Sequence, residues 1–247
     1  MIDILLIVDR SGSMIDAASD HIGGMKSFIR DQKDLEDDAS LTIIQFDSHN
    51  PCEVVLNRAS IRNVSLDSIN LIPRGGTPLY SAVGLATEHL QKRQAASPPP
   101  SSTLCMIVTD GQNTDVTEWT KDRLKMRIAE LESKNWTFLF LGANVDAFSE
   151  AGTVGISYAH SANYSNAVPG SVAAAYGTIS NKVAAVRSAG IAGHDSGLLR
   201  SAAMCFTASD LKNIAEGKAV AFDGGKSILT KTPTFVSPST PDDKDEE

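Results

Sequence analysis

Three almost uninterrupted apolar runs constrain the fold of this 247-residue chain more than any other feature. They cover residues 4–8, 104–108 and 136–141. Each has the length of a strand and lacks the alternating polar residues that would mark a solvent-exposed face. Strands buried on both faces are typical of parallel sheets that are covered by helices. Segments with helical spacing of apolar residues accompany them, at 14–32, 78–93 and 170–189. The pattern predicts an α/β fold of the doubly wound class.

Shorter patterns complete the predicted sheet. Residues 41–46 and 53–56 read as two strands joined by a tight turn, so the second should be an antiparallel edge strand. A helix should carry Leu124, Ile128 and Leu131 at helical spacing, and a short helix near 145–151 should precede a short strand near 156–160. We therefore expect a mostly parallel central sheet with one antiparallel edge strand and helices on both faces. The buried stripe of the first helix should consist of Ile15, Ala18, Ile22, Met25 and Ile29.

Composition divides the chain into three parts. Residues 1–190 carry the predicted sheet and its helices and form one domain. Residues 191–239 are rich in Gly, Ser, Thr and Pro but include several large apolar side chains, which predicts an irregular extension packed on that domain. Residues 240–247 are strongly acidic, and we expect them to form a solvated, disordered tail.

Oxygen-bearing side chains gather where the predicted strands end. Asp9, Ser11 and Ser13 follow the first strand, Thr77 opens the helix at 78, and Asp110 follows the strand at 103–109. Ligand sites of α/β sheets lie at the carboxyl ends of the strands, so these segments should converge. Two carboxylates and three hydroxyls suit a hard cation, and the absence of Cys and His from these three segments argues against zinc. The segments predict a site for Mg²⁺ or Mn²⁺.

Each segment also has a purely structural interpretation. Ser11 or Ser13 could cap the first helix, and Thr77 before Pro78 has the sequence of an N-cap followed by proline at the first helical position. Asp110 with the glycine after it could form a turn. The conjunction of five oxygen ligands in order on three loops favours the metal site.

The motif resembles the metal-ion-dependent adhesion site (MIDAS) of von Willebrand factor A domains, over roughly residues 1–190. All five positions of that motif match. The segments Val8–Met14, Gln45–Asp47 and Phe140–Asn144 are in addition similar to stand-alone bacterial and phage members of the class. The resemblance implies that Ser11, Ser13 and Thr77 bind the metal directly, whereas Asp9 and Asp110 balance its charge and one or both of them act partly through water. It also implies that one coordination position stays open for a carboxylate of a partner.

The expected function is metal-dependent recognition of a protein through its Asp or Glu side chain. The alternative is a structural or assembly component, for example of a phage particle. A metal-assisted hydrolase is the third interpretation. No general base accompanies Asp9 and Asp110, so we expect no enzyme and assign no catalytic residue. The net charge of −8 without clustered Lys or Arg argues against nucleic acid. No leader or membrane-spanning run is evident, which predicts a cytoplasmic protein that binds no membrane.

Overall fold

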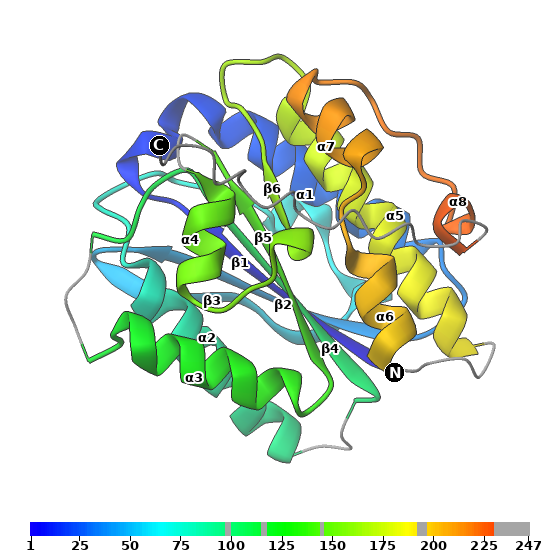
Figure 1. The fold of residues 1–247 in the computed structure, drawn as a ribbon, viewed down its shortest axis with the longest axis horizontal. Coiled ribbons are helices and arrows are strands. Elements are labelled where there is room, and N and C mark those ends of the chain that lie inside the picture. The colour runs from blue at the N-terminus through cyan, green and yellow to red at the C-terminus, as the bar shows by residue number, and fades with distance from the viewer. Residues whose placement is uncertain (97–99, 115–117, 144–145, 192–196, 230–247) are drawn as a thin grey trace, which may run out of the picture.

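A single six-stranded sheet forms the centre of the computed structural model, which describes residues 1–96, 100–114, 118–143, 146–191 and 197–229 (Figure 1). Its strand order is β3-β2-β1-β4-β5-β6, and every pairing is parallel except that of β3 with β2. This arrangement confirms the predicted fold class. The strands are β1 (Ile2–Asp9), β2 (Ala39–Asp47), β3 (Asn50–Ser60), β4 (Ser102–Thr109), β5 (Trp136–Gly142) and β6 (Ser161–Asn163).

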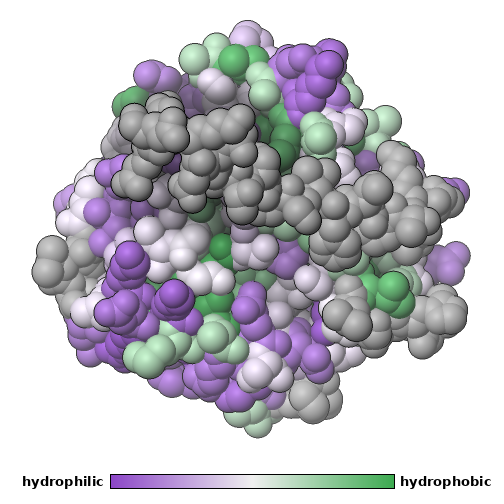
Figure 2. All heavy atoms as spheres, in the orientation of Figure 1, coloured by the Kyte–Doolittle hydropathy of each residue, from purple (hydrophilic) through white to green (hydrophobic). Residues whose placement is uncertain are grey.

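Helices cover both faces of the sheet (Figure 1). One layer contains α1 (Ala18–Lys33), α5 (Ser171–Ile191), α6 (Gly197–Met204) and α7 (Ala208–Ala215), and the other contains α2 (Leu79–Ala95), α3 (Lys121–Glu132) and α4 (Ala147–Thr153). Figure 2 shows mainly hydrophilic side chains at the lower left, where α3 lies in Figure 1, as its Lys-, Arg- and Glu-rich sequence requires. In the described part of the chain, no helix has the length and apolarity to cross a membrane.

The chain reverses its direction of winding between β1 and β4. From β1 it crosses to β2 on one side, whereas from β4 it continues to β5 on the other. Loops that leave adjacent parallel strands toward opposite faces open a crevice at the carboxyl ends of those strands. The register pairs Val8 of β1 with Val108 of β4, so the residues that follow them, Asp9 and Thr109, end at the same edge. This edge carries the candidate site.

Two local predictions were wrong. Ile15 is 67% exposed, because residues Gly12–Ala17 form a 3₁₀ helix whose side chains do not continue the α-helical stripe of α1. The predicted strand at 156–160 is instead a 3₁₀ turn, Tyr158–His160, with β6 following it. The hydroxyl of Ser157 accepts a hydrogen bond from the Ala159 amide at 3.3 Å and stabilises that turn.

The segment after α5 is more regular than its composition predicted. Residues 191–239 were expected to be irregular, but their described part contains α6, α7 and the single turn α8 (Lys226–Leu229). Thr207 and Asp210 form a reciprocal capping box that starts α7. The predicted acidic tail, residues 240–247, lies outside the described residues.

Adjacent glycines in α1 have opposite surroundings and yield a matched prediction. A Cβ added to Gly24 would lie 2.2 Å from Cδ2 of Tyr176 on α5, whereas one added to Gly23 would meet no atom within 4 Å. We expect Gly24→Ala to lower the free energy of unfolding by about 1 to 3 kcal/mol through overpacking. Gly23→Ala should raise it by about 0.5 to 1 kcal/mol, because alanine favours the helix. Urea unfolding of both variants measures this, and equal shifts of the same sign would contradict the α1–α5 packing.

Candidate metal centre

Asp9 is the most deeply buried member of the predicted site. It ends β1 with no exposed surface. One carboxylate oxygen, Oδ1, accepts a hydrogen bond from the Ser11 amide at 2.6 Å, and Oδ2 accepts one from the Thr109 hydroxyl at 2.7 Å. These bonds orient the carboxylate at the crevice between β1 and β4.

Ser11, Ser13 and Asp110 form a continuous chain of polar contacts beside Asp9. The hydroxyl oxygens of Ser11 and Ser13 lie 3.0 Å apart, and the Ser13 hydroxyl donates to Asp110 Oδ1 at 2.6 Å. Asn166 donates from Nδ2 to the other oxygen of Asp110 at 3.3 Å. The 3₁₀ turn that begins at Gly12 therefore brings both serines toward the carboxylate that follows β4.

Thr77 reaches the same place from the loop before α2. A Cβ added to Gly111 would lie only 2.9 Å from Thr77 Oγ1, so the threonine hydroxyl rests against the turn after Asp110. The structure thus brings together all five residues that the sequence singled out: Asp9, Ser11, Ser13, Thr77 and Asp110.

Hydrogen bonds hold the Thr77 loop from both sides. The carbonyl of Gly75 accepts from the Gly12 amide at 2.9 Å, and the Gly76 amide donates to the Ser48 hydroxyl at 2.9 Å. The amide of Thr77 donates to Thr114 Oγ1 at 3.0 Å, and its carbonyl accepts from the Thr114 amide at 2.9 Å. The loop is therefore attached to three separate segments of the site edge.

The two carboxylates carry an electrostatic cost. Burial raises the pKa of Asp9 to about 6, against the lowering effect of the Thr109 and Ser11 hydrogen bonds, and the nearby charge of Asp110 adds to the rise. Burial also raises the pKa of Asp110. None of the ion pairs among the described residues includes either carboxylate, so no protein cation offsets their charge. A bound cation would offset this charge. The donor set of carboxylates and hydroxyls fits a hard divalent ion.

The capping interpretation fails for these hydroxyls. Ser11 precedes the first 3₁₀ helix, but its side chain makes no capping hydrogen bond. The N-cap of α2 is Pro78, not Thr77, and it makes no side-chain capping bond either. Within the described residues no cluster of three or more His, Cys, Asp or Glu could hold a metal, so a metal at this edge depends on the hydroxyls.

An ion-pair cluster connects the first motif loop to the loop of Thr77. Arg10, which directly precedes Ser11, is buried, and its Nε donates a hydrogen bond to Asp47 Oδ2 at 2.5 Å. Arg74 donates from Nε to the same Asp47 oxygen at 3.0 Å, and both arginines also contact Glu53. Asp47 accepts further hydrogen bonds from the amides of the turn after β2. We call these four residues, Arg10, Asp47, Glu53 and Arg74, the ion-pair cluster.

The residues that support the site are not among those predicted from the sequence. Thr109 immediately precedes Asp110 on a strand that was predicted, so its place at the sheet edge was available as a signal. Asn166 is 56 residues from Asp110 along the chain, and no motif connects them. Asp47 and Arg74 likewise meet only in the folded chain.

Comparison with known proteins now identifies the fold family. Residues 3–167 match the family described as von Willebrand factor type A domain, which is more than half of the chain. The chain belongs to this family. No curated protein matches the sequence. The family match covers the sheet and the five candidate residues and ends one residue after Asn166.

Solved structures support the von Willebrand factor type A fold. The chain is similar to the pilus adhesin SpaC from Lactobacillus rhamnosus GG in its open conformation, with 14% identity and a TM-score of 0.60 over 74% of this chain and 30% of that one. It is similar to the vWF domain of the type V pili tip protein Mfa5 from Porphyromonas gingivalis, with 12% identity and a TM-score of 0.52 over 74% of this chain and 94% of that one.

A third similar structure contains a metal. Proximal thread matrix protein 1 from the mussel byssus, with a zinc-occupied MIDAS motif, has 16% identity and a TM-score of 0.50 over 67% of this chain and 41% of that one. The chain spans less than half the length of the mussel proteins that it matches. At these identities the likeness shows the fold alone.

Proposed function

We propose that this chain binds a divalent cation, Mg²⁺ or Mn²⁺, at Asp9, Ser11, Ser13, Thr77 and Asp110. The observation that carries the proposal is a pair of buried carboxylates that lie beside three hydroxyls and have no cationic partner among the described residues. The zinc-occupied MIDAS of the similar mussel protein supports a divalent ion at this position of the fold. Mg²⁺ and Mn²⁺ suit oxygen ligands better than zinc does.

We further propose that the cation recognises an acidic side chain of a protein partner. Three of the five ligands are neutral hydroxyls, and the resemblance implies that one or both aspartates act partly through water, so the ion still attracts a further oxygen ligand strongly. A glutamate or aspartate that completes the coordination therefore gains a strong charge-assisted bond. Its affinity should depend on the metal, because the two site carboxylates would otherwise repel it. Similar structures from pilus proteins support a role in protein contacts.

Thr77 provides the sharpest test of this recognition. The probe is a seven-residue Gly/Ser peptide with one central Glu, measured by fluorescence anisotropy in 10 mM MgCl₂ and in EDTA, with a Gln peptide as control. Thr77→Ala should keep part of the metal-induced stabilisation, because four ligands remain, but should weaken peptide binding by about tenfold or more. Thr77→Ser retains the hydroxyl and should restore binding.

Two outcomes would count against recognition through this metal. One is equal binding of the Glu peptide to Thr77→Ala and wild type, at the same magnesium dependence. The other is binding that persists in EDTA. A stable assembly of the protein that survives chelation would point instead to a structural role.

A further inference from the structure

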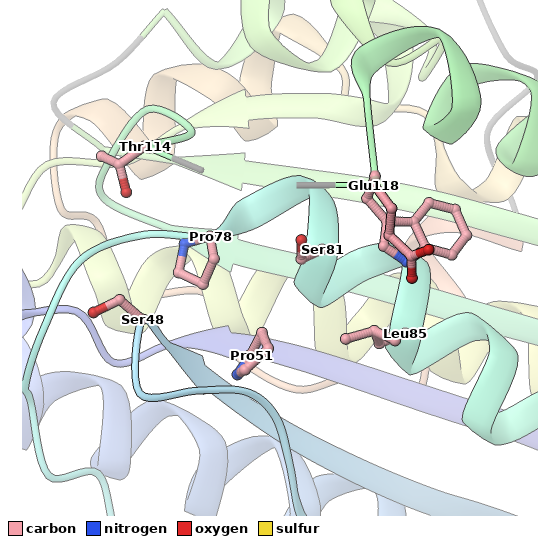
Figure 3. A pocket seen from close by; sticks show the side chains of 8 residues that line it. Ser48, Pro51, Pro78, Ser81, Leu85, Thr114 and Glu118 are labelled. Atoms are coloured by element: carbon pink, nitrogen blue, oxygen red, sulfur yellow. The ribbon is translucent and has the colours of Figure 1, made fainter. Parts of the chain in front are cut away.

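A groove of about 390 Å³ lies beside the Thr77 loop (Figure 3). Three parts of the chain line it: the turn after β2 with the start of β3, the beginning of α2, and the described residues Thr114, Glu118 and Trp119 between β4 and α3. Its volume is at the small end of the range for ligand pockets, about 300 to 1,000 Å³, and suits one or two side chains. The lining residues are Ser48, Pro51, Pro78, Ser81, Leu85, Thr114, Glu118 and Trp119.

The groove and the candidate metal centre share their walls. Ser48 and Thr114, at one end of the groove in Figure 3, are the residues that hold the Gly76 and Thr77 amides. Pro78 follows Thr77 directly. A chain segment that placed an acidic side chain at the metal would therefore continue into this groove or pass beside it.

The far wall of the groove is preformed. Trp119 is 4% exposed, and its ring occupies the space left by Gly84 on α2, where an added Cβ would lie 2.2 Å from the ring. The guanidinium carbon of Arg123 lies 4.0 Å from the centre of the same ring and covers it. Binding here would require little ordering of this side chain, which favours affinity.

The lining selects the kind of side chain that fits. Pro51 and Leu85 are half-buried and, with the more deeply buried Pro78 and Trp119, form the apolar lining, and the serine and threonine side chains beside them are small. Among the described lining residues, the charged one is Glu118, whose side chain is 74% exposed and pairs with Arg123 at 3.3 Å. A second acidic side chain of the partner would be repelled by Glu118. An aliphatic side chain or proline would instead bury apolar surface on several sides, which is favourable.

We propose that this groove binds an apolar side chain, aliphatic or proline, that neighbours the metal-binding acidic residue in the same partner segment. The inference rests on the proposed function, since it assigns a second contact to the same partner. It makes the recognition element a short acidic–apolar sequence with a fixed order, because this groove lies on one side of the metal centre.

The test uses the same Gly/Ser peptide with a central Glu. Leu, Pro, Ser or Glu replaces one position at a time on either side, and binding is measured in MgCl₂ and in EDTA. We expect Leu or Pro to strengthen magnesium-dependent binding by about tenfold at one position on one side only, and Glu at that position to weaken it.

Variants locate the effect in the groove. Leu85→Arg places a long charged chain across it and should abolish the preference for Leu or Pro, while binding of the unsubstituted Glu peptide and the magnesium-induced stabilisation remain. Leu199→Arg, at a 54% exposed position on α6 in the opposite helix layer, should leave the preference for Leu or Pro, the binding of the Glu peptide and the stabilisation unchanged.

The failures of the two proposals are distinguishable. Magnesium-dependent binding of the Glu peptide without any positional preference would overturn the groove and leave the proposed function intact. The same preference in Leu85→Arg as in wild type would also overturn the groove. Absence of magnesium-dependent binding of every peptide would overturn the proposed function and the groove with it.

Discussion

Adding 10 mM MgCl₂ to the metal-free protein is expected to raise its melting midpoint by about 5 to 11 °C. A dissociation constant of about 0.1 mM would give roughly 2.7 kcal/mol of stabilisation at this concentration, and a chain of this size gains about 2 to 4 °C per kcal/mol. The physical source is the repulsion and desolvation of two buried carboxylates, which the cation relieves. Thermal unfolding with and without EDTA measures the shift, and MnCl₂ should produce a comparable one.

Asp9→Asn is the matched variant for this prediction. Asparagine keeps the shape and can still accept a hydrogen bond, but it removes a buried charge that pairs with no cation in the described part of the metal-free protein. We expect the metal-free variant to melt at or above the wild-type midpoint and to show no magnesium shift. A shift of wild-type size in Asp9→Asn would exclude Asp9 from the metal site.

Asp47→Asn should destabilise the protein by about 2 to 4 kcal/mol at neutral pH. Asp47 has no exposed surface, and although burial opposes its charge, hydrogen bonds from Arg74, His49, Arg10 and Asn50 lower its pKa to about 2. Asparagine would leave the buried guanidinium of Arg10 with Glu53 alone, and it would detach Arg74 from the other side of the site. Chemical denaturation measures the loss, and Asp16→Asn, at an exposed acid near the same edge, is the control.

The difference between Asp47→Asn and wild type should depend on pH in one direction. Because folding lowers the pKa of Asp47, its stabilisation is complete above about pH 4 and is lost as the pH falls toward 2. The two proteins should therefore converge in stability at the acidic end. A constant difference from pH 7 to pH 2 would show that the carboxylate charge is not the cause.

The fold was predictable because its strongest signals are local. Apolar runs of strand length and helices with apolar stripes define β1, β4, β5, α2 and α5 without any long-range information. β6 has only three residues, and its pairing with β5 decides its position more than its own sequence does. The helices after α5 are short, and the Thr207–Asp210 spacing that starts α7 was a readable signal that composition obscured.

Of the candidate site, only the five candidate ligands were predictable from the sequence. Asp9, Ser11, Ser13, Thr77 and Asp110 follow strands or open a helix in an order that a parallel sheet brings together. The residues that support these five make contacts between positions that are distant along the chain, such as Asn166 with Asp110 or Arg74 with Asp47. Such pairs leave no periodic or spaced pattern in one sequence. The role of the five residues as metal ligands stays a prediction.

Anomalous scattering from crystals grown with MnCl₂ tests the central claim most directly. The measurement locates manganese independently of any assumed ligand. We predict one strong peak among the side-chain oxygens of Asp9, Ser11, Ser13, Thr77 and Asp110, and its loss in Asp9→Asn crystals grown in the same way. The absence of a peak there at millimolar manganese, or a peak only at another position, would contradict the account.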